Sequence, residues 1–235
     1  MLPVLRETLR LLLAHLDLFT RISLTVWLPA TVAASYQDFF AGGERDVPRG
    51  LGVVLTTELL LGPLVAAATI AALARIVRGV PVSYAEAMAH GLAAWPRLFV
   101  VRFVTGLIVV GGLLLLVVPG LVLLVRYAVV DPAAVLEGAG PTEARRRSIE
   151  LTSSQRRDVF LTGGALFLAL GAASVALSSL IQLVPALNHF VVRVLLDCAF
   201  AVAQNVFTIA LFLLYQRGLY QRGLAGSAAS ASPAA

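Results

Sequence analysis

The chain has 235 residues, of which 59% are hydrophobic and 13% are charged, and all 18 of its basic residues are arginines. A water-soluble fold of this size could not cover its surface with so few polar side chains, so we expect lipid to face most of it. The single cysteine, Cys198, excludes an intrachain disulfide and a cysteine-based metal site. The net charge of +5 does not indicate nucleic acid as a partner, because the arginines flank apolar segments.

The N-terminal segment predicts an amphipathic helix that lies in the cytoplasmic membrane interface. Its leucines recur at helical spacing with charged side chains beside them: Leu5, Leu9, Leu12 and Leu16, with Arg6, Glu7 and Arg10. Two later segments, Ser83 to Ala93 and Pro141 to Arg157, are amphipathic in the same way. In the first of them, Ser83 and Glu86 have the spacing of a capping box.

Six apolar stretches approach or exceed the roughly 20 helical residues that a bilayer core requires. They run from about Thr20 to Tyr36, Leu51 to Leu73, Leu98 to Val118, Leu121 to Leu136, Val159 to Val184 and His189 to Tyr215. These stretches lack the alternation of a transmembrane barrel. We therefore predict an all-α fold, a polytopic membrane helical bundle of six transmembrane helices plus interfacial amphipathic helices.

Residues 1–223 are predicted to form a single integral membrane domain, and the Ala/Ser-rich residues 224–235 a disordered tail. Pro119-Gly120 divides the long apolar stretch of residues 98–130, so we expect a tight helical hairpin to turn there. Asp131-Pro132 lies within the fourth span and should distort it.

Arginine placement predicts how the chain crosses the membrane, because cytoplasmic loops carry an excess of basic residues. Basic clusters lie in the N-terminal segment, after the second and fourth spans, and at the C-terminus: Arg6, Arg10 and Arg21; Arg75, Arg78, Arg97 and Arg102; Arg145, Arg146, Arg147, Arg156 and Arg157; Arg217 and Arg222. Six spans place all of these on one side, with Arg45 and Arg49 opposite. We therefore expect a multi-pass protein of a bacterial cytoplasmic (inner) membrane with both termini in the cytoplasm.

Several residues together resemble the signature of a known family. They are Pro119-Gly120, Arg126, Asp131-Pro132, Leu136-Glu137-Gly138, Ala144 to Ser148 and Leu151-Thr152, with Leu5 to Thr8 and Leu214-Tyr215. The pattern resembles the membrane domain of glycerophosphoryl diester phosphodiesterases and its stand-alone relatives. In the full-length enzymes, catalysis belongs to a separate barrel of about 250 residues, which nothing in this sequence can encode. The resemblance therefore implies a membrane fold and a supporting role, and no phosphodiesterase activity.

Charged and polar residues inside the spans are the candidates for a functional site, because an unpaired charge in a membrane costs several kcal/mol. The predicted intramembrane polar cluster consists of Glu58, Arg126, Asp131, Arg193, Asp197, Gln204 and Asn205, with Gln182 as a further candidate. A rise of about 1.5 Å per residue puts Glu58, Arg126, Arg193 and Asp197 at similar depth, and the other members extend the cluster deeper. Arg126 could instead reach outward beside Tyr127. The cluster is either a cavity for a lipid headgroup, ion or small solute, or an ion-pair network that fixes helix register.

A run of arginines after the fourth span is expected to contact anionic headgroups on the cytoplasmic side: Arg145, Arg146, Arg147, Arg156 and Arg157. Each contributes about 1 kcal/mol near such a surface. Ordinary anchoring by positive loops explains the same arginines without a specific lipid site.

No enzyme motif is present, since the sequence lacks H-E-x-x-H, a P-loop and G-x-S-x-G. We therefore expect a non-enzymatic membrane protein without cofactor or metal, which supports envelope function by binding membrane lipids or a protein partner, a second copy included. The alternative is a small transporter or carrier that uses the polar cluster, and a third hypothesis is an enzyme acting on lipid. A carrier requires the clustered charges to line a hydrated cavity, whereas a scaffold holds them bonded to one another.

Overall fold

The computed structural model describes residues 2–40, 47–184 and 189–230, and within these ranges the chain forms helices and no strand. The helices are α1 (Leu2–Ala14), α2 (Leu16–Phe40), α3 (Val47–Ile76), α4 (Tyr84–Leu115), α5 (Val117–Arg126), α6 (Val130–Leu136), α7 (Pro141–Thr152), α8 (Arg156–Leu183), α9 (Phe190–Ala203) and α10 (Asn205–Ser230). The prediction of an all-α fold is confirmed.

Six stretches of the described helices are long and apolar enough to cross a membrane. They are Leu16–Tyr36, Leu55–Ile76, Tyr84–Leu115, Val117–Leu136, Arg156–Leu183 and Phe190–Gly223. The fourth contains both α5 and α6, and the sixth contains α9 and most of α10. Each stretch overlaps one predicted span, so the predicted fold class of a helical membrane protein with six candidate spans is confirmed.

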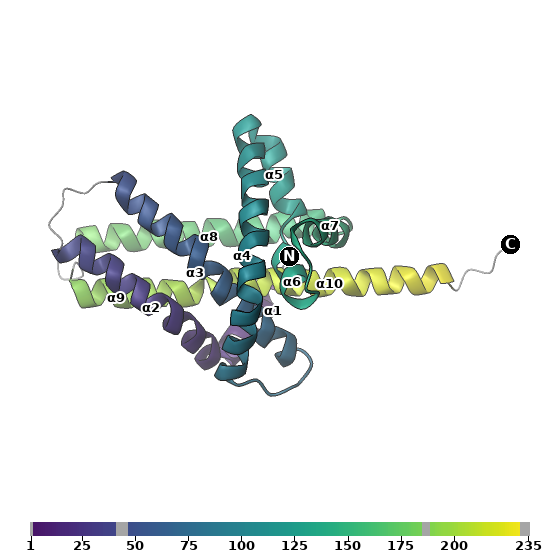
Figure 1. Ribbon diagram of the computed structural model, residues 1–235, viewed down its shortest axis with the longest axis horizontal. Coiled ribbons are helices and arrows are strands. Elements are labelled where there is room, and N and C mark those ends of the chain that lie inside the picture. The colour runs from purple at the N-terminus through teal and green to yellow at the C-terminus, as the bar shows by residue number, and fades with distance from the viewer. Residues whose placement is uncertain (1, 41–46, 185–188, 231–235) are drawn as a thin grey trace.

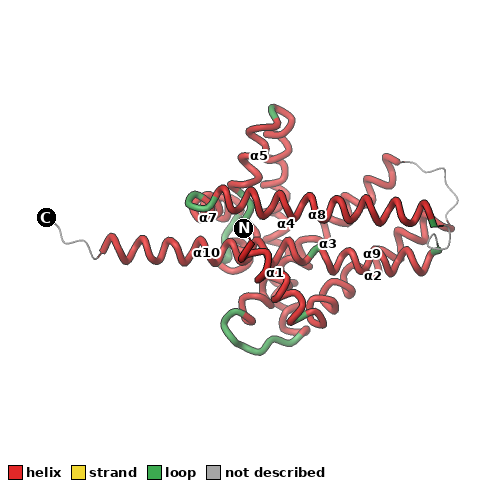
Figure 2. Tube along the Cα trace, turned by 180° about the vertical axis from the view of Figure 1, so that it is seen from behind, coloured by secondary structure: helices red, strands yellow, loops and turns green. Residues whose placement is uncertain are grey.

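The long helices run in different directions (Figures 1 and 2). α8 and the succession of α9 and α10 follow the long axis of the molecule, α2 and α3 lie obliquely, and α4 and α5 stand across them as a hairpin. The end of this hairpin points away from the other helices, and the side chains from Leu114 to Val118 are between 64% and 83% exposed. So large an exposed apolar patch is suited to lipid rather than to water.

Two clusters of buried apolar residues hold the helices together, and α3 and α10 contribute to both. The approach of α3 to α4 depends on small side chains, since Ala67 and Ala68 are fully buried. A Cβ built on Gly91 of α4 would lie 2.7 Å from the Cβ of Ala68. Only glycine therefore permits the observed packing at this point.

The hairpin turns earlier than the sequence predicts. α4 ends at Leu115 and α5 begins at Val117, so the turn is at Leu116, and Pro119-Gly120 lies in the first turn of α5. Proline is tolerated there because the first N–H groups of a helix have no intrahelical acceptor. Gly120 serves the packing of α5 on α4, since a Cβ at this position would collide with the side chain of Leu113.

The predicted capping box is confirmed: the Ser83 hydroxyl accepts from the Glu86 N–H, and the Glu86 carboxylate accepts from the Ser83 N–H. The segment from Ser83 to Ala93 is nevertheless no separate interfacial helix, because α4 continues through Pro96 to its end. The predicted distortion near Asp131-Pro132 is confirmed, since the helix breaks between α5 and α6.

Both ends of the chain differ in detail from the predictions. α1 is helical, but its buried face consists of Val4, Thr8 and Leu12, while Leu9 and Leu16 of the predicted stripe are exposed. The inner face of α1 packs mainly on α10, which leaves the exposed leucines to face lipid. α10 continues to Ser230, so residues 224–230 of the predicted tail are helical in the structure, and residues 231–235 lie outside the described residues.

Candidate functional site

A groove of about 450 Å³ lies between α3, α4, α8 and the junction of α9 with α10. Its apolar lining consists of Trp27, Gly62, Val65, Ala66, Phe167, Leu170, Gly171, Phe200, Ala201 and Phe207. Its polar lining consists of Glu58, Arg102, Ser174, Gln204, Asn205 and Thr208. The groove, as we call this cavity below, thus combines extensive apolar walls with one carboxylate and one guanidinium.

Arg102 of α4 is held in place by Asp131 of α6, which is not itself a lining residue of the groove. Its Nε and Nη2 both donate to Asp131 Oδ2, at 3.0 and 2.6 Å. The side chains of Arg102 and Asp131 are only 29% and 15% exposed. Because Asp131 lies in the first turn of α6, the break between α5 and α6 is what brings this carboxylate to α4.

Glu58 and Arg102 approach each other at Gly62, one turn beyond Glu58 on α3. A Cβ built on Gly62 would lie 2.8 Å from Glu58 Oε1 and 3.3 Å from Arg102 Nη1, so the missing side chain leaves room for both groups. Within the described ranges, Glu58 interacts electrostatically with Arg102, but no hydrogen bond or close ion pair joins its carboxylate to another residue. Arg102 donates to Asp131 through Nε and Nη2, and no described acceptor bonds to its Nη1. One acceptor and one donor in the groove therefore retain unused bonding capacity.

Asn205 fixes the junction of α9 and α10 at the floor of the groove. Its Nδ2 donates to Ser23 Oγ at 2.7 Å and to the Val202 carbonyl at 3.0 Å, and its Oδ1 accepts from Thr69 Oγ1 at 3.1 Å. These bonds tie α10 to α2 and α3. The amide is fully engaged in structure, whereas the neighbouring Gln204 is exposed in the groove lining.

The structure brings together only part of the predicted polar cluster. Glu58, Gln204 and Asn205 line the groove, and Asp131 adjoins it through Arg102. The predicted meeting of the charges of Glu58, Arg126, Arg193 and Asp197 is not observed in the described contacts. Arg193 and Asp197 form their own ion pair on α9, at 3.1 Å, and are not in the groove lining. Their side chains are 38% and 35% exposed.

Arg126 is likewise not in the groove lining, and no described ion pair joins it to Glu58, Arg193 or Asp197. It ends α5, and its Nε is buried without a hydrogen-bond partner among the described residues. The depth count placed it wrongly because the hairpin turns earlier than expected and the helix breaks directly after this residue. Arg102, rather than Arg126, is the arginine that lies beside Glu58. Arginine placement assigns Arg102 to a loop, although its apolar neighbours, Val101 and Phe103, already indicate a residue inside a span.

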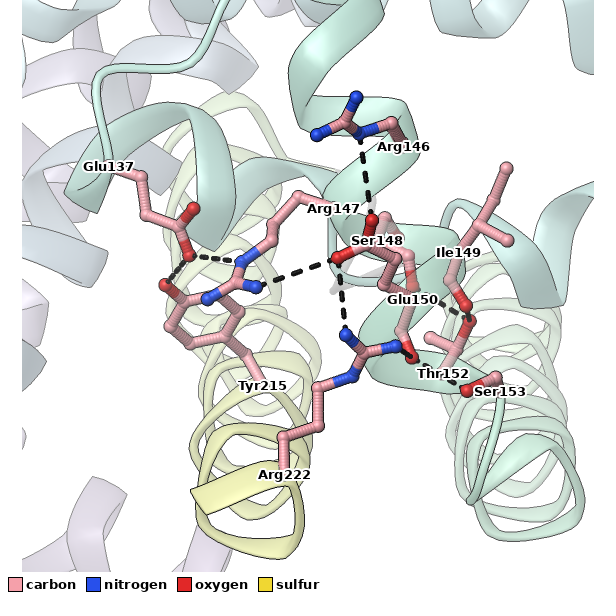
Figure 3. A network of polar contacts seen from close by, with 10 residues as sticks. All are labelled: Glu137, Arg146, Arg147, Ser148, Ile149, Glu150, Thr152, Ser153, Tyr215 and Arg222. Carbon is pink, nitrogen blue, oxygen red and sulfur yellow. Dashed lines mark hydrogen bonds and ion pairs between the residues drawn. The ribbon is translucent and has the colours of Figure 1, made fainter. Parts of the chain in front are cut away.

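A second polar network ties α7 to α10 and to the residue that follows α6 (Figure 3). Glu137 Oε1 accepts from Tyr215 Oη at 2.6 Å and from Arg147 Nε at 3.0 Å. Glu150 forms ion pairs with Arg147 at 3.6 Å and with Arg222 at 3.3 Å. The hydrogen bond with Glu137 raises the pKa of Arg147 above its usual value, so this guanidinium stays charged.

Ser148 of α7 secures the break between α5 and α6. Its Oγ accepts from the Val129 N–H at 3.2 Å and donates to the Arg126 carbonyl at 2.8 Å. Thr152 Oγ1 lies 3.4 Å from the same carbonyl, but its short hydrogen bond goes to the Ser148 carbonyl, at 2.8 Å. Several residues of the family-like signature therefore have a structural explanation here, because α7 satisfies backbone groups that the break leaves open.

The arginines predicted to contact anionic lipid have different surroundings. Arg146, Arg156 and Arg157 are exposed, although Arg146 also forms an ion pair with Glu150 at 3.6 Å. Arg145 Nε instead donates to the Pro141 carbonyl at 3.0 Å, and Arg147 is bonded to Glu137. Only the exposed arginines are accessible to headgroups along their length. No group of three or more His, Cys, Asp and Glu side chains in the described chain could hold a metal ion.

Comparison with known proteins identifies a UPF0259 membrane protein of Sodalis glossinidius (strain morsitans) as similar, with 33% identity over 97 residues. The match covers 41% of this chain and 38% of the relative, so the chain spans well under half of that protein's length. No family model and no solved structure matches the sequence. The resemblance to the phosphodiesterase membrane domain is not confirmed, whereas the similarity and the helices agree that this is a helical membrane protein.

Proposed function

We propose that the chain is a non-enzymatic protein of the bacterial cytoplasmic membrane that binds a membrane lipid in the groove. The composition of the groove is the observation that carries this proposal. Its walls are aromatic and aliphatic, and Glu58 and Arg102 Nη1 supply an unused acceptor and donor. Ligand sites typically combine apolar walls with a few placed polar groups, in volumes of about 300–1,000 Å³. A phospholipid has a charged headgroup for the polar groups and acyl chains for the apolar walls, and its headgroup and upper chains would fill a site of this size.

The position of α8 supports entry of lipid from the side. α8 packs against α10 and α5, and only 11% of its apolar span is buried. Its groove-lining residues Phe167 and Gly171 are exposed, so the groove is open along this helix. An acyl chain can therefore enter between α8 and the remaining helices without leaving the bilayer.

Two glycines of α8 provide a test with a matched control. A Cβ at Gly171, in the groove, or at Gly163, outside its lining, would meet no atom within 4 Å, so both positions accept a larger side chain. We expect Gly171→Phe to fill the groove and reduce the phospholipid that co-purifies with the protein, measured by mass spectrometry of extracted lipid. Gly163→Phe should retain the wild-type amount. Equal lipid content in the two variants, with unchanged thermal melts in detergent, would refute the proposal.

A small transporter or carrier is the second candidate function. The unpaired Glu58 carboxylate favours it, because intramembrane carboxylates often mark ion pathways. The separation of Arg126, Arg193 and Asp197 from the groove disfavours it, since a carrier was expected to use them together. Proteoliposomes that release a trapped cation faster with wild type than with Glu58→Gln would favour the carrier, whereas we expect no such difference.

The orientation proposed from arginine placement is part of the same account. Both termini are assigned to the cytoplasm, where the exposed Arg146, Arg156 and Arg157 would contact anionic headgroups. Reporter proteins fused to the two ends should show the same, cytoplasmic side. Opposite sides for the two reporters would require an odd number of crossings.

A further inference from the structure

We propose that the groove recognises a zwitterionic aminophospholipid, whose phosphate binds Arg102 and whose primary ammonium binds Glu58. This inference rests on the proposed function, that the groove binds a lipid, and adds which headgroup it takes. The argument comes from the bonding capacity of the two side chains, from their charge balance and from their shared position at Gly62.

Arg102 is arranged to donate to an anionic group. Its Nε and Nη2 are engaged by Asp131, which fixes the plane of the guanidinium, and Nη1 is left at Gly62 on the groove side. Guanidinium N–H groups form short, charge-assisted bonds to phosphate oxygens. A phosphate in the groove would therefore find a donor whose orientation is already set.

Glu58 is arranged to accept from a cation. An ionised carboxylate is an acceptor only, and no described residue donates to this one. A primary ammonium carries N–H donors that match it, whereas the trimethylammonium of a choline headgroup carries none. The groove should thus prefer an ethanolamine headgroup to a choline headgroup of the same charge.

The charge balance of the site excludes an anionic lipid as the preferred ligand. Two carboxylates, Glu58 and Asp131, surround the one guanidinium of Arg102, so the site without ligand has an excess of negative charge. An anionic lipid such as phosphatidylglycerol would add to this excess in an apolar setting, at a considerable cost in free energy. A zwitterionic headgroup adds no net charge and places its ammonium on the unpaired carboxylate.

The positions of the two groups suit one headgroup. Glu58 Oε1 and Arg102 Nη1 lie 2.8 and 3.3 Å from the same point, the place that a Gly62 Cβ would occupy. In phosphatidylethanolamine only two carbons separate the phosphate ester oxygen from the ammonium, so a single headgroup can reach both. The apolar walls around Phe200 and Phe207 remain for the acyl chains, which commits the site to a lipid rather than to a free zwitterion.

Native mass spectrometry of the full-length protein in detergent can test this assignment. Dioleoyl phosphatidylethanolamine, phosphatidylcholine and phosphatidylglycerol would be titrated separately, with glycerophosphoethanolamine, the zwitterionic headgroup without acyl chains, as a soluble competitor. We expect phosphatidylethanolamine to bind about tenfold more tightly than the other two, which corresponds to one charge-assisted hydrogen bond. Glu58→Gln should remove the preference over phosphatidylcholine, whereas Asp197→Asn, which removes a carboxylate outside the groove, should keep it.

The outcomes separate the two proposals. Equal binding of the three lipids, or a preference for phosphatidylglycerol, would overturn the headgroup assignment while leaving lipid binding in the groove intact. Displacement of bound lipid by equimolar glycerophosphoethanolamine would show that the groove binds a soluble zwitterion and would overturn the assignment to a lipid. Absence of any lipid from the wild-type protein would overturn the proposed function itself. Thermal melts of Glu58→Gln would establish that the variant is folded before its affinities are compared.

Discussion

The ion pair between Arg102 and Asp131 makes a quantitative stability prediction. Asp131→Leu removes the acceptor of two hydrogen bonds, of 3.0 and 2.6 Å, and strands a guanidinium that is largely buried. Breaking a buried pair from one side costs about 3–5 kcal/mol. Because Arg102 keeps partial access to the groove through Nη1, we expect a smaller loss, about 2–3 kcal/mol of unfolding free energy.

A double-mutant cycle isolates the pairing. Arg102→Leu with Asp131→Leu leaves no stranded charge, so the double variant should lose less stability than Asp131→Leu alone, with a coupling of about 2 kcal/mol. Circular dichroism during unfolding in mixed micelles with increasing SDS provides the free energies. The control pair is Arg21 with Asp17 on α2, whose side chains are 64% and 77% exposed and whose coupling should be roughly 0.5 kcal/mol or less. Additive losses at Arg102 and Asp131 would refute the reasoning.

The remaining predictions concern α7 and the basic surface. Ser148→Ala leaves the Val129 N–H and the Arg126 carbonyl without their hydroxyl partner, so it should cost about 2 kcal/mol in the same unfolding assay. The control is Ser153→Ala, whose exposed hydroxyl bonds only the Glu150 carbonyl and whose loss should cost less than roughly 1 kcal/mol. Equal losses in the two variants would contradict the bridging role of Ser148. Replacing the exposed Arg146, Arg156 and Arg157 with Gln should reduce retention of phosphatidylglycerol in a salt-dependent way. Unchanged retention would leave these arginines with a role in topology alone.

Hydropathy and arginine spacing were sufficient to predict the class of fold. A long apolar stretch has few alternatives to a helix in lipid, because its backbone groups must bond within the stretch. The break near Asp131-Pro132 was also predictable, since proline disrupts the preceding turn. The turn at Leu116 was not, because it depends on how Gly112 and Gly120 let α4 and α5 pack together. Such packing depends on three-dimensional contacts that no local pattern contains.

The candidate site was only partly predictable for a related reason. Glu58, Asp131, Gln204 and Asn205 were identified because polar residues in apolar stretches are rare and need partners. Counting depth along separate helices could not show that Arg102 is the cation beside Glu58, because the count assumes straight, parallel spans. In the structure α4 stands across other long helices, so equal depth along two helices does not place their side chains together.

Photo-crosslinking tests the claim that a lipid occupies the groove most directly. The full-length protein would be reconstituted with phosphatidylethanolamine carrying a diazirine in one acyl chain, irradiated and mapped by peptide mass spectrometry. We predict adducts concentrated on groove residues such as Phe200 and Phe207, and their loss in Gly171→Phe but not in Gly163→Phe. Labelling spread evenly over exposed residues outside the groove, such as Leu168 and Val175, and unchanged by Gly171→Phe would contradict the account.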